Sequence, residues 1–202
     1  MINEKKGFTL VELMIVLAIL ALLAAIIIFA LNPAQLFARA RDSQRFADLR
    51  ALTSAINYYL VITSTPVLDG GTNTLCVGST GSATIYATSA VTAAVPWATT
   101  NTTVRGMDGS GWIKINFVLT GETPLGSLPM DPKNSGSAAS PSTFYAFSCS
   151  SSQGFEINAN LESTTYKGQE ATDGGDFATV FEVGTALTLL PSAAVSGWYL
   201  NH

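Results

Sequence analysis

The N-terminal part of the chain is dominated by one apolar segment, which begins abruptly at Phe8 after a short basic stretch. The 24 residues from Phe8 to Leu31 would form an α-helix about 36 Å long, enough to cross the hydrocarbon core of a bilayer. Lys5 and Lys6 favour a cytoplasmic N-terminus, with the rest of the chain outside the membrane. Glu12 interrupts the pattern, because it places a carboxylate among apolar side chains.

A second helical pattern follows Asn32-Pro33. Pro33 lacks a backbone N–H and disfavours helical geometry at Asn32, so we expect a kink or a break there. Residues 34–60 then have an amphipathic helical pattern. Its apolar positions are three or four residues apart and lie on one face: Phe46, Leu49, Leu52, Ile56 and Tyr59. We expect the downstream domain to cover this face.

From Val61 onward the chain is rich in Thr, Ser, Gly and Ala, and short β-like runs alternate with turn residues. The predicted strands are residues 83–87, 112–119, 143–148, 154–161, 179–183 and 186–190. The best alternation lies in Trp112–Phe117. Residues 88–111 and 128–142 are predicted as irregular connections, although the first could contain a strand. The pattern predicts an α+β fold, with a long N-terminal helix packed on a C-terminal antiparallel sheet.

Charge is sparse and unevenly distributed in this chain of 202 residues, of which 48% are hydrophobic and 12% charged, with a net charge of −4. Four arginines (Arg39, Arg41, Arg45 and Arg50) lie just after the apolar segment. They could meet lipid head groups or an acidic partner, or be solvated helix charges that pair with Asp42 and Asp48. From Val61 onward there are four Lys or Arg and ten Asp or Glu. This acidic half has no basic patch for nucleic acid.

Cysteine and histidine usage argues against a metal centre or an enzyme. Cys76 and Cys149 are too far apart in sequence for a clustered metal site. Outside the cytoplasm they could pair, and a loop of this size would contribute about 4 kcal/mol by the chain-entropy estimate; the sequence leaves a disulfide and two free thiols both open. The single histidine, His202, is the last residue. His-based triads and His metal clusters are therefore not expected, and we predict no catalytic function.

The N-terminal stretch Lys5-Lys6-Gly7-Phe8-Thr9-Leu10-Val11-Glu12 closely resembles the class III signal sequence of bacterial type IV pilins and of the pseudopilins of type II secretion. The resemblance extends through the amphipathic helix to about Leu60. It implies a pilin fold with a removed leader (1–7), a transmembrane and assembly helix (8–31), an amphipathic helix continuing into the head (32–62), and a β-rich head (63–202).

The resemblance also implies roles for three residues. Gly7 would precede the cut made by prepilin peptidase, and Phe8 would become the new, N-methylated terminus. Glu12 would pair with the Phe8 amine of a neighbouring subunit. A carboxylate near the bilayer centre costs about 2.5–3.5 kcal/mol on insertion scales. An ammonium group on the next subunit would neutralise it, so the pair would select one axial stagger between subunits.

Short motifs in the second half resemble the head of pseudopilin G. They are residues 128–134 (LPMDPKN), 144–147 (FYAF) and 154–162 (GFEINANLE), with 173–176 (DGGD) and 181–185 (FEVGT) resembling the tails of similar pilins. In major pseudopilins a C-terminal acidic loop binds calcium, which makes Glu170, Asp173 and Asp176 candidate calcium ligands. The EF-hand spacing is absent, and an Asp-Gly turn between strands is the alternative. No other cofactor is expected.

The resemblance implies a structural function for the whole chain. A processed subunit would sit as a single-pass protein in the cytoplasmic membrane and then polymerise into an extracellular or periplasmic filament. Its partners would be other copies of itself, prepilin peptidase, and an inner-membrane assembly platform with its ATPase. A head of about 140 residues favours a type IV pilus, serving adhesion, twitching or DNA uptake. The alternatives are a type II secretion pseudopilus and, more distantly, a bitopic surface-binding protein or a membrane-anchored hydrolase.

Overall fold

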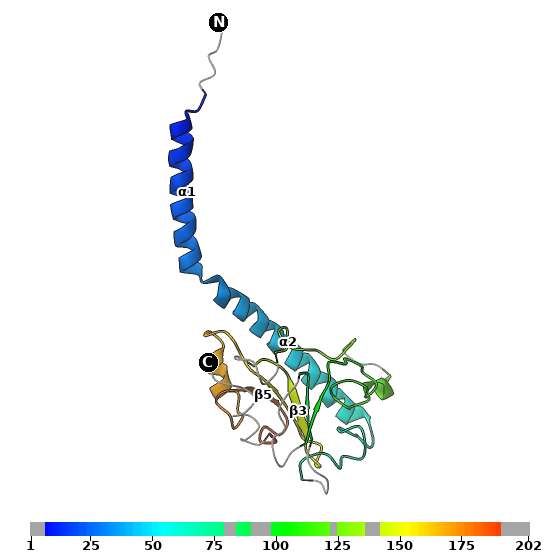
Figure 1. The fold of residues 1–202 in the computed structure, drawn as a ribbon. Coiled ribbons are helices and arrows are strands. Elements are labelled where there is room, and N and C mark those ends of the chain that lie inside the picture. The colour runs from blue at the N-terminus through cyan, green and yellow to red at the C-terminus, as the bar shows by residue number, and fades with distance from the viewer. Residues whose placement is uncertain (1–6, 79–83, 90–97, 122–124, 136–141, 191–202) are drawn as a thin grey trace. The chain divides into compact units, whose positions relative to one another are not determined.

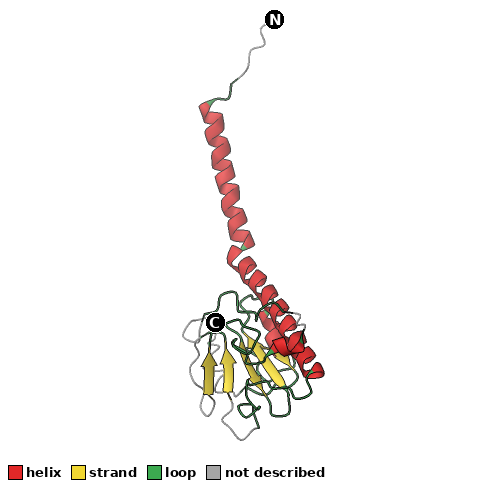
Figure 2. Cartoon of the chain, turned by 90° about the vertical axis from the view of Figure 1, so that its right-hand side faces the viewer, coloured by secondary structure: helices red, strands yellow, loops and turns green. Residues whose placement is uncertain are grey.

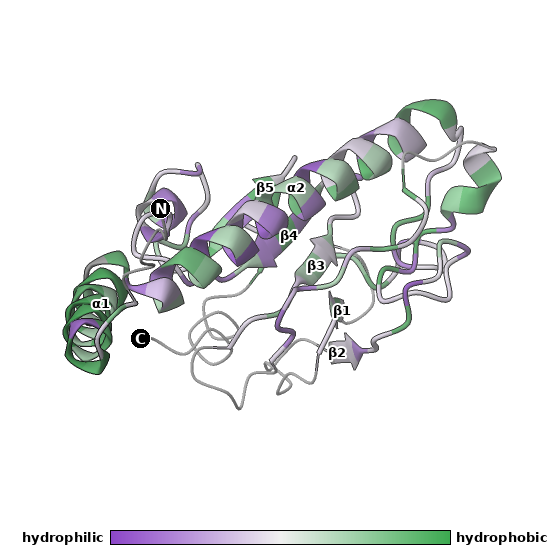
Figure 3. Ribbon diagram, turned by 90° about the horizontal axis from the view of Figure 1, so that it is seen from above, coloured by the Kyte–Doolittle hydropathy of each residue, from purple (hydrophilic) through white to green (hydrophobic). Residues whose placement is uncertain are grey.

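The computed structural model describes residues 7–78, 84–89, 98–121, 125–135 and 142–190. The chain divides into two compact units, Met1–Ala38 and Arg39–His202. The first contains helix α1 (Leu10–Leu31). All of the side chains described on this helix are exposed, and Figure 3 shows it as almost uniformly hydrophobic. Its stretch Leu10–Phe29 has a mean hydropathy of 3.1 and is long and apolar enough to cross a membrane.

The predicted interruption at Asn32-Pro33 is confirmed. Asn32 ends α1 in a left-handed conformation, with φ 43° and ψ 74°, and α2 (Pro33–Ile62) begins at the next residue. The Asn32 carbonyl accepts a hydrogen bond from the Gln35 N–H at 3.0 Å. Pro33 fits the first position of the new helix because an N–H there would have no intrahelical acceptor.

The predicted apolar face of α2 is also confirmed. Leu49, Leu52, Ile56 and Tyr59 are buried. Phe46 is half-buried and meets the rings of Tyr166 and Phe181 edge-on, at centroid distances of 5.3 and 4.9 Å.

The head is built on a five-stranded sheet with the order β2-β1-β3-β4-β5, seen as yellow arrows in Figure 2. The strands are β1 (Thr84–Ala87), β2 (Ala98–Asn101), β3 (Ala146–Cys149), β4 (Phe155–Ala159) and β5 (Phe181–Gly184). The α+β prediction is confirmed, with one difference in detail. The pair β1–β2 is parallel while the other three pairs are antiparallel, so the sheet is mixed.

Apolar side chains cover both faces of this sheet. The main core lies between α2 and the sheet and includes Trp112, Tyr145, Phe147, Phe155 and Ile157; Figure 1 shows the sheet beside α2. A smaller cluster contains the neighbouring residues Ile85, Ala87, Phe144 and Ala146. Alternate residues of a strand point to opposite faces, so β1 and β3 contribute to both clusters.

A disulfide joins Cys76 to Cys149, with the two Cα atoms 4.8 Å apart. Of the two alternatives that the sequence left open, the structure contains the paired form. Both residues belong to the main core. The bond ties the segment after α2 to the end of β3.

Several strand predictions need correction. Four of the six predicted runs overlap β1, β3, β4 and β5, although β3 and β5 each end one residue beyond the predicted run, at Cys149 and Gly184. Ala83, the first residue of the run 83–87, lies outside the described residues. The run 112–119 is wrong, because it forms one isolated bridge, between Asp108 and Asn116, followed by a 3-10 turn at Phe117–Thr120. The run 186–190 is wrong as well, because it forms turns. Of the two alternatives left open for residues 88–111, an irregular connection or a missed strand, the structure contains a strand, β2. Residues 90–97 of this stretch, and residues 136–141 of the connection 128–142, lie outside the described residues.

One of the alternatives for the arginines, solvated helix charges that pair with Asp42 and Asp48, is half right for Arg45: this residue pairs with Asp42, but its side chain is fully buried and not solvated. Its guanidinium binds Asp131 through two hydrogen bonds of 2.6 and 3.0 Å. It also contacts Asp42 at 2.7 Å and Glu162 at 2.9 Å. Arg41, whose side chain is partly exposed, forms an ion pair with Glu162 at 2.7 Å. We call these five residues the Arg45 network; it connects α2 to two head segments singled out by their resemblance to pseudopilin G.

Candidate processing and assembly site

The start of α1 is organised around Thr9 and Glu12. Thr9 is the N-cap residue, and its hydroxyl oxygen accepts the Glu12 N–H at 3.2 Å. The Glu12 carboxylate accepts two hydrogen bonds in return, from the Thr9 N–H and the Thr9 hydroxyl, both at 2.9 Å. This reciprocal arrangement is a capping box, which satisfies backbone donors that the first helical turn leaves free.

The capping box gives Glu12 a role within its own chain that the sequence analysis did not identify. The signal was present, because threonine followed three residues later by glutamate before an apolar run is a capping-box pattern. Both bonds from Thr9 reach the same oxygen, Oε2. Within the described part of the chain, Oε1 accepts no hydrogen bond. Capping therefore uses one carboxylate oxygen and leaves the other for a further donor.

Gly7 and Phe8 precede this box in an open segment. Phe8 is 92% exposed. A Cβ atom added to Gly7 would meet no described atom within 4 Å, and its backbone has no left-handed φ. Neither packing nor backbone conformation in this chain thus requires glycine at this position. A requirement for glycine would have to come from another protein that reads the segment.

The surface of α1 beyond Glu12 is uncovered and apolar. Among the residues from Phe8 to Leu31, Glu12 carries the only charge. Large apolar side chains are exposed around the whole helix, from Leu10 at 74% to Leu31 at 58%. A helix that is apolar on all sides is stable only when lipid or other protein surrounds it. The pairing of Glu12 with the Phe8 amine of another copy, and processing at Gly7, stay predictions.

The candidate calcium ligands lie near the end of the head. Glu170 is buried, and its Oε1 accepts the Leu161 N–H at 2.8 Å; burial raises the pKa of this carboxyl to about 7. Asp173 accepts the Gly175 N–H at 2.9 Å and the Glu182 N–H at 2.7 Å. Asp176 is exposed.

These contacts of Asp173 are those of an Asp-Gly turn. In the described ranges no group of three or more His, Cys, Asp or Glu residues is placed to hold a metal ion. Calcium binding by Glu170, Asp173 and Asp176 stays a prediction.

Two further buried carboxylates were missed by sequence reasoning. Glu156 on β4 and Glu182 on β5 are both buried, and the Asn158 amide donates to Glu156 at 2.8 Å and to Glu182 at 3.4 Å. Burial raises the pKa of both carboxyls. Their proximity arises from strand register, since Asn158 lies opposite Glu182, and no local pattern in the sequence indicates it.

Comparison with known proteins gives one match. Residues 2–28 match the family model described as the prokaryotic N-terminal methylation motif. No curated protein and no solved structure matches the chain. The matched segment contains Gly7, Phe8, the capping box and most of α1, and it ends before α2. The chain therefore carries a prokaryotic N-terminal methylation motif of the kind that type IV pilins and pseudopilins share, which marks it as a substrate of prepilin peptidase.

Proposed function

We propose that this chain is a structural subunit of a type IV pilus-like filament, cleaved after Gly7 and polymerised through α1. One observation carries the proposal: the methylation motif leads directly into a helix that is apolar on every side and has a carboxylate in its first turn. The head has its own core and needs no contribution from α1 to bury it.

The exposed surface of α1 supports polymerisation. In the membrane, lipid tails cover this helix as well as another protein would, so apolar contact alone gives little drive for association. Once a subunit leaves the bilayer, each large apolar side chain left in water costs about 1.5–3 kcal/mol. Packing α1 against the α1 helices of other copies removes that cost. The same helix then serves as an anchor before assembly and as a filament core afterwards.

The first turn of α1 supports a defined register in that core. Cleavage after Gly7 would create an ammonium group on Phe8, one residue from the Thr9 N–H that Glu12 already binds. Oε1 of Glu12 is the acceptor for the Phe8 ammonium of a neighbouring copy. A charge-assisted hydrogen bond in a low-dielectric environment is stronger than a neutral one. The axial stagger that forms the Glu12–Phe8 pair is therefore more stable than a stagger that leaves both charges unpaired.

A second candidate is a pseudopilin of a type II secretion system. It is favoured by the head, where Asp131 and Glu162, from two segments that resemble pseudopilin G, both bind Arg45. Deleting the gene distinguishes the two: loss of surface filaments with normal secretion indicates a pilus, whereas loss of secreted substrates indicates a pseudopilus.

Two substitutions at the motif test the proposal. Gly7→Trp should give an uncleaved, membrane-bound precursor, while Gly168→Trp, at an open position in the head, should be cleaved normally. Immunoblotting of whole cells separates the precursor from the processed form. Normal cleavage of the Gly7 variant would contradict the assignment.

Glu12→Gln separates capping from ion pairing. Glutamine can replace glutamate in a capping box, but it carries no charge. We expect this variant to be cleaved yet to yield few sheared filaments, since the intersubunit ion pair is lost. Thr9→Val removes the cap and keeps the carboxylate, and should retain more filaments than Glu12→Gln. Wild-type filament yield from Glu12→Gln would show that Glu12 serves only as a cap.

A further inference from the structure

The chain contains one Asn-X-Ser/Thr triplet, Asn101-Thr102-Thr103, which the proposed function does not use. This triplet is the sequence that N-glycosylation requires, provided that its middle residue is not proline. Because the head is rich in Ser and Thr, the triplet alone is a weak signal. Whether Asn101 can serve as an acceptor depends on its exposure, its contacts and the space around it.

The triplet lies on the surface, where a strand ends. Asn101 is the last residue of β2, and the side chains of Asn101 and Thr103 are both exposed. The N–H of Thr102 still donates to the Ala87 carbonyl at 3.2 Å, and the chain then leaves the sheet as an irregular segment. Both residues that a glycosylating enzyme must recognise are therefore accessible from outside the head.

The side-chain amide of Asn101 has no structural role within the described part of the chain, where it forms no hydrogen bond. Other asparagines of the head differ in this respect. Asn116 caps a 3-10 turn by accepting the Val118 N–H at 3.1 Å. Asn134 donates to the Thr88 carbonyl at 3.1 Å. No described contact therefore accounts for asparagine at position 101 or would be broken by a group attached to it.

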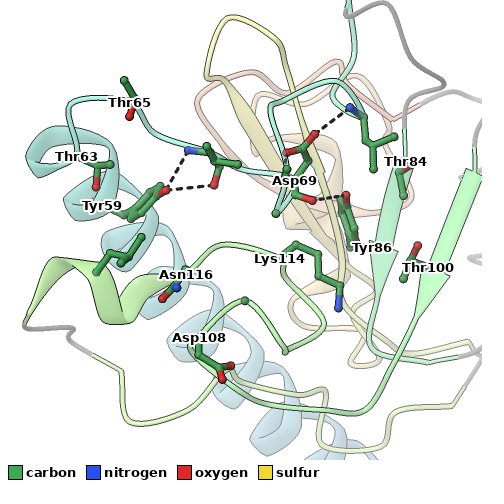
Figure 4. Close-up of a pocket in the computed structure, with 16 residues that line it drawn as sticks. Tyr59, Thr63, Thr65, Asp69, Thr84, Tyr86, Thr100, Asp108, Lys114 and Asn116 are labelled. Atoms are coloured by element: carbon green, nitrogen blue, oxygen red, sulfur yellow. Dashed lines mark hydrogen bonds between the residues drawn. The ribbon is translucent and has the colours of Figure 1, made fainter.

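The sheet leaves space for such a group. Among the described strands, β2 lies at the edge of the sheet, as Figure 3 shows. Thr100 lines a pocket in the head together with Tyr59 of α2 and Tyr86 of β1 (Figure 4). Alternate residues of a strand point to opposite faces, so Asn101 lies on the other face, beside its partner Ala87. A sugar on Asn101 would therefore not disturb the packing of α2 on the sheet.

We propose that Asn101 is an N-glycosylation site. The sugar donor is a glycan linked to a polyprenyl diphosphate, and a membrane-bound oligosaccharyltransferase catalyses the transfer. The side-chain nitrogen of Asn101 forms a bond to the anomeric carbon of the glycan, while the bond from that carbon to the diphosphate oxygen breaks. Polyprenyl diphosphate leaves, and the amide nitrogen loses one proton.

The attached glycan protects the edge of the sheet. Exposed edge strands can pair with a strand of another chain, whereas a glycan is bulky and solubilising. Beside β2 it hinders such pairing. The inference relies on a head outside the cytoplasm, as in the proposed function, and does not rely on polymerisation.

The test is mass spectrometry of the full chain, isolated from the membranes of the cells that naturally produce it. Wild type should be heavier than its polypeptide and a terminal methyl group require, by the mass of at least one sugar. Fragment spectra should place that sugar on Asn101. A wild-type chain without an added sugar, or with sugars on other residues only, would overturn the proposal.

Four variants made in the same cells complete the test. Asn101→Gln should lose the added mass, because glutamine is not an acceptor. Thr103→Val, which removes the hydroxyl and keeps the shape, should lose it too, whereas Thr103→Ser should retain it. Asn57→Gln is the matched control, because Asn57 is exposed on α2 outside any such triplet, and it should retain the added mass. All three positions are exposed, so the variants keep the fold.

Retention of the sugar by Asn101→Gln or Thr103→Val would place it on another residue and refute the assignment, as would its loss from Asn57→Gln. The result is separable from that for the filament. A chain that is cleaved after Gly7 and found in filaments but carries no sugar overturns this inference and leaves the proposed function intact. An uncleaved chain that carries the sugar on Asn101 supports this inference and contradicts the proposed function.

Discussion

Replacing Arg45 with methionine tests whether the Arg45 network fixes α2 to the head. Two of its carboxylates keep other partners in the variant. Glu162 keeps Arg41 and Lys133, and Asp42 keeps the N–H groups of Glu162 and Ser163. Asp131 is 4% exposed and has no cation other than Arg45 in the described part of the chain. The substitution therefore leaves one buried carboxylate, that of Asp131, without a counter-charge.

The expected loss of stability follows from this unpaired buried charge. Removing one partner of a buried ion pair costs about 3–5 kcal/mol, and Asp131 retains only the N–H groups of Lys133 and Asn134, at 2.9 and 3.0 Å. We expect Arg45→Met to lower the free energy of unfolding by about 4 kcal/mol. Arg50→Met is the control, because Arg50 is exposed on the same helix. Its effect should stay within about 0.5 kcal/mol.

Urea unfolding of the full chain in detergent, followed by near-UV circular dichroism, reports on the head rather than on α1. Adding Asp131→Asn to Arg45→Met removes the unpaired charge and keeps a side-chain oxygen that can accept from the N–H groups of Lys133 and Asn134. The double variant should therefore lose less than the sum of the single losses, by about 2 kcal/mol. Equal stability of Arg45→Met and Arg50→Met, or strict additivity in the cycle, would refute the reasoning.

Two further predictions concern the disulfide and the buried carboxyls. Replacing both Cys76 and Cys149 with serine should lower the free energy of unfolding by about 4 kcal/mol, measured by urea unfolding; reduced wild type should match the variant, and a change below about 1 kcal/mol would contradict the estimate. Burial raises the pKa of Glu170 from 4.5 to about 7, so the folded head favours the protonated form. The contribution of Glu170 to the free energy of unfolding is therefore fully present below pH 4.5 and is lost as pH rises through about 7. This loss lowers the free energy of unfolding by about 3 kcal/mol. Glu170→Gln should flatten the dependence of the thermal-unfolding midpoint on pH between about pH 5 and 8. Glu156 and Glu182 are still present in this variant and keep their own contributions to that dependence. An unchanged dependence on pH would contradict the role of Glu170.

Periodicity predicted the helices well, because their burial follows a single repeat. The buried positions Leu49, Leu52, Ile56 and Tyr59 are three or four residues apart, and α1 needs only apolar length. The same repeat continues backwards to Arg45 and Asp42. Because these two residues are charged, the sequence suggested that they lie on a solvated face. They are buried instead, because the groups that pair with them lie 86 to 121 residues further along the chain.

The sheet was harder to predict because alternation reports burial and not backbone pairing. Ile113, Ile115 and Phe117 are buried while Lys114 and Asn116 are more exposed, as the alternation predicted. Yet with the described residues this segment forms a single isolated bridge. The position of β2 within residues 88–111 could not be predicted, because its polar residues 99–101 pair in parallel with β1 at the edge of the sheet and show no alternation of apolar side chains.

The candidate assembly site was largely readable from the sequence, because its residues are neighbours in the chain. Gly7, Phe8 and Glu12 lie within one local motif. The capping box required only the Thr9–Glu12 spacing. The pocket in the head was not readable from the sequence, because its lining residues come from segments spread between Tyr59 and Leu119.

Mass spectrometry of subunits released from sheared cell-surface or overexpressed periplasmic filaments tests the central claim most directly. The account predicts that the chain is found in filaments, begins at Phe8 and carries one added methyl group at that terminus. Filament subunits that retain Met1 or begin beyond Phe8, or a chain found only as a membrane-bound monomer, would contradict it.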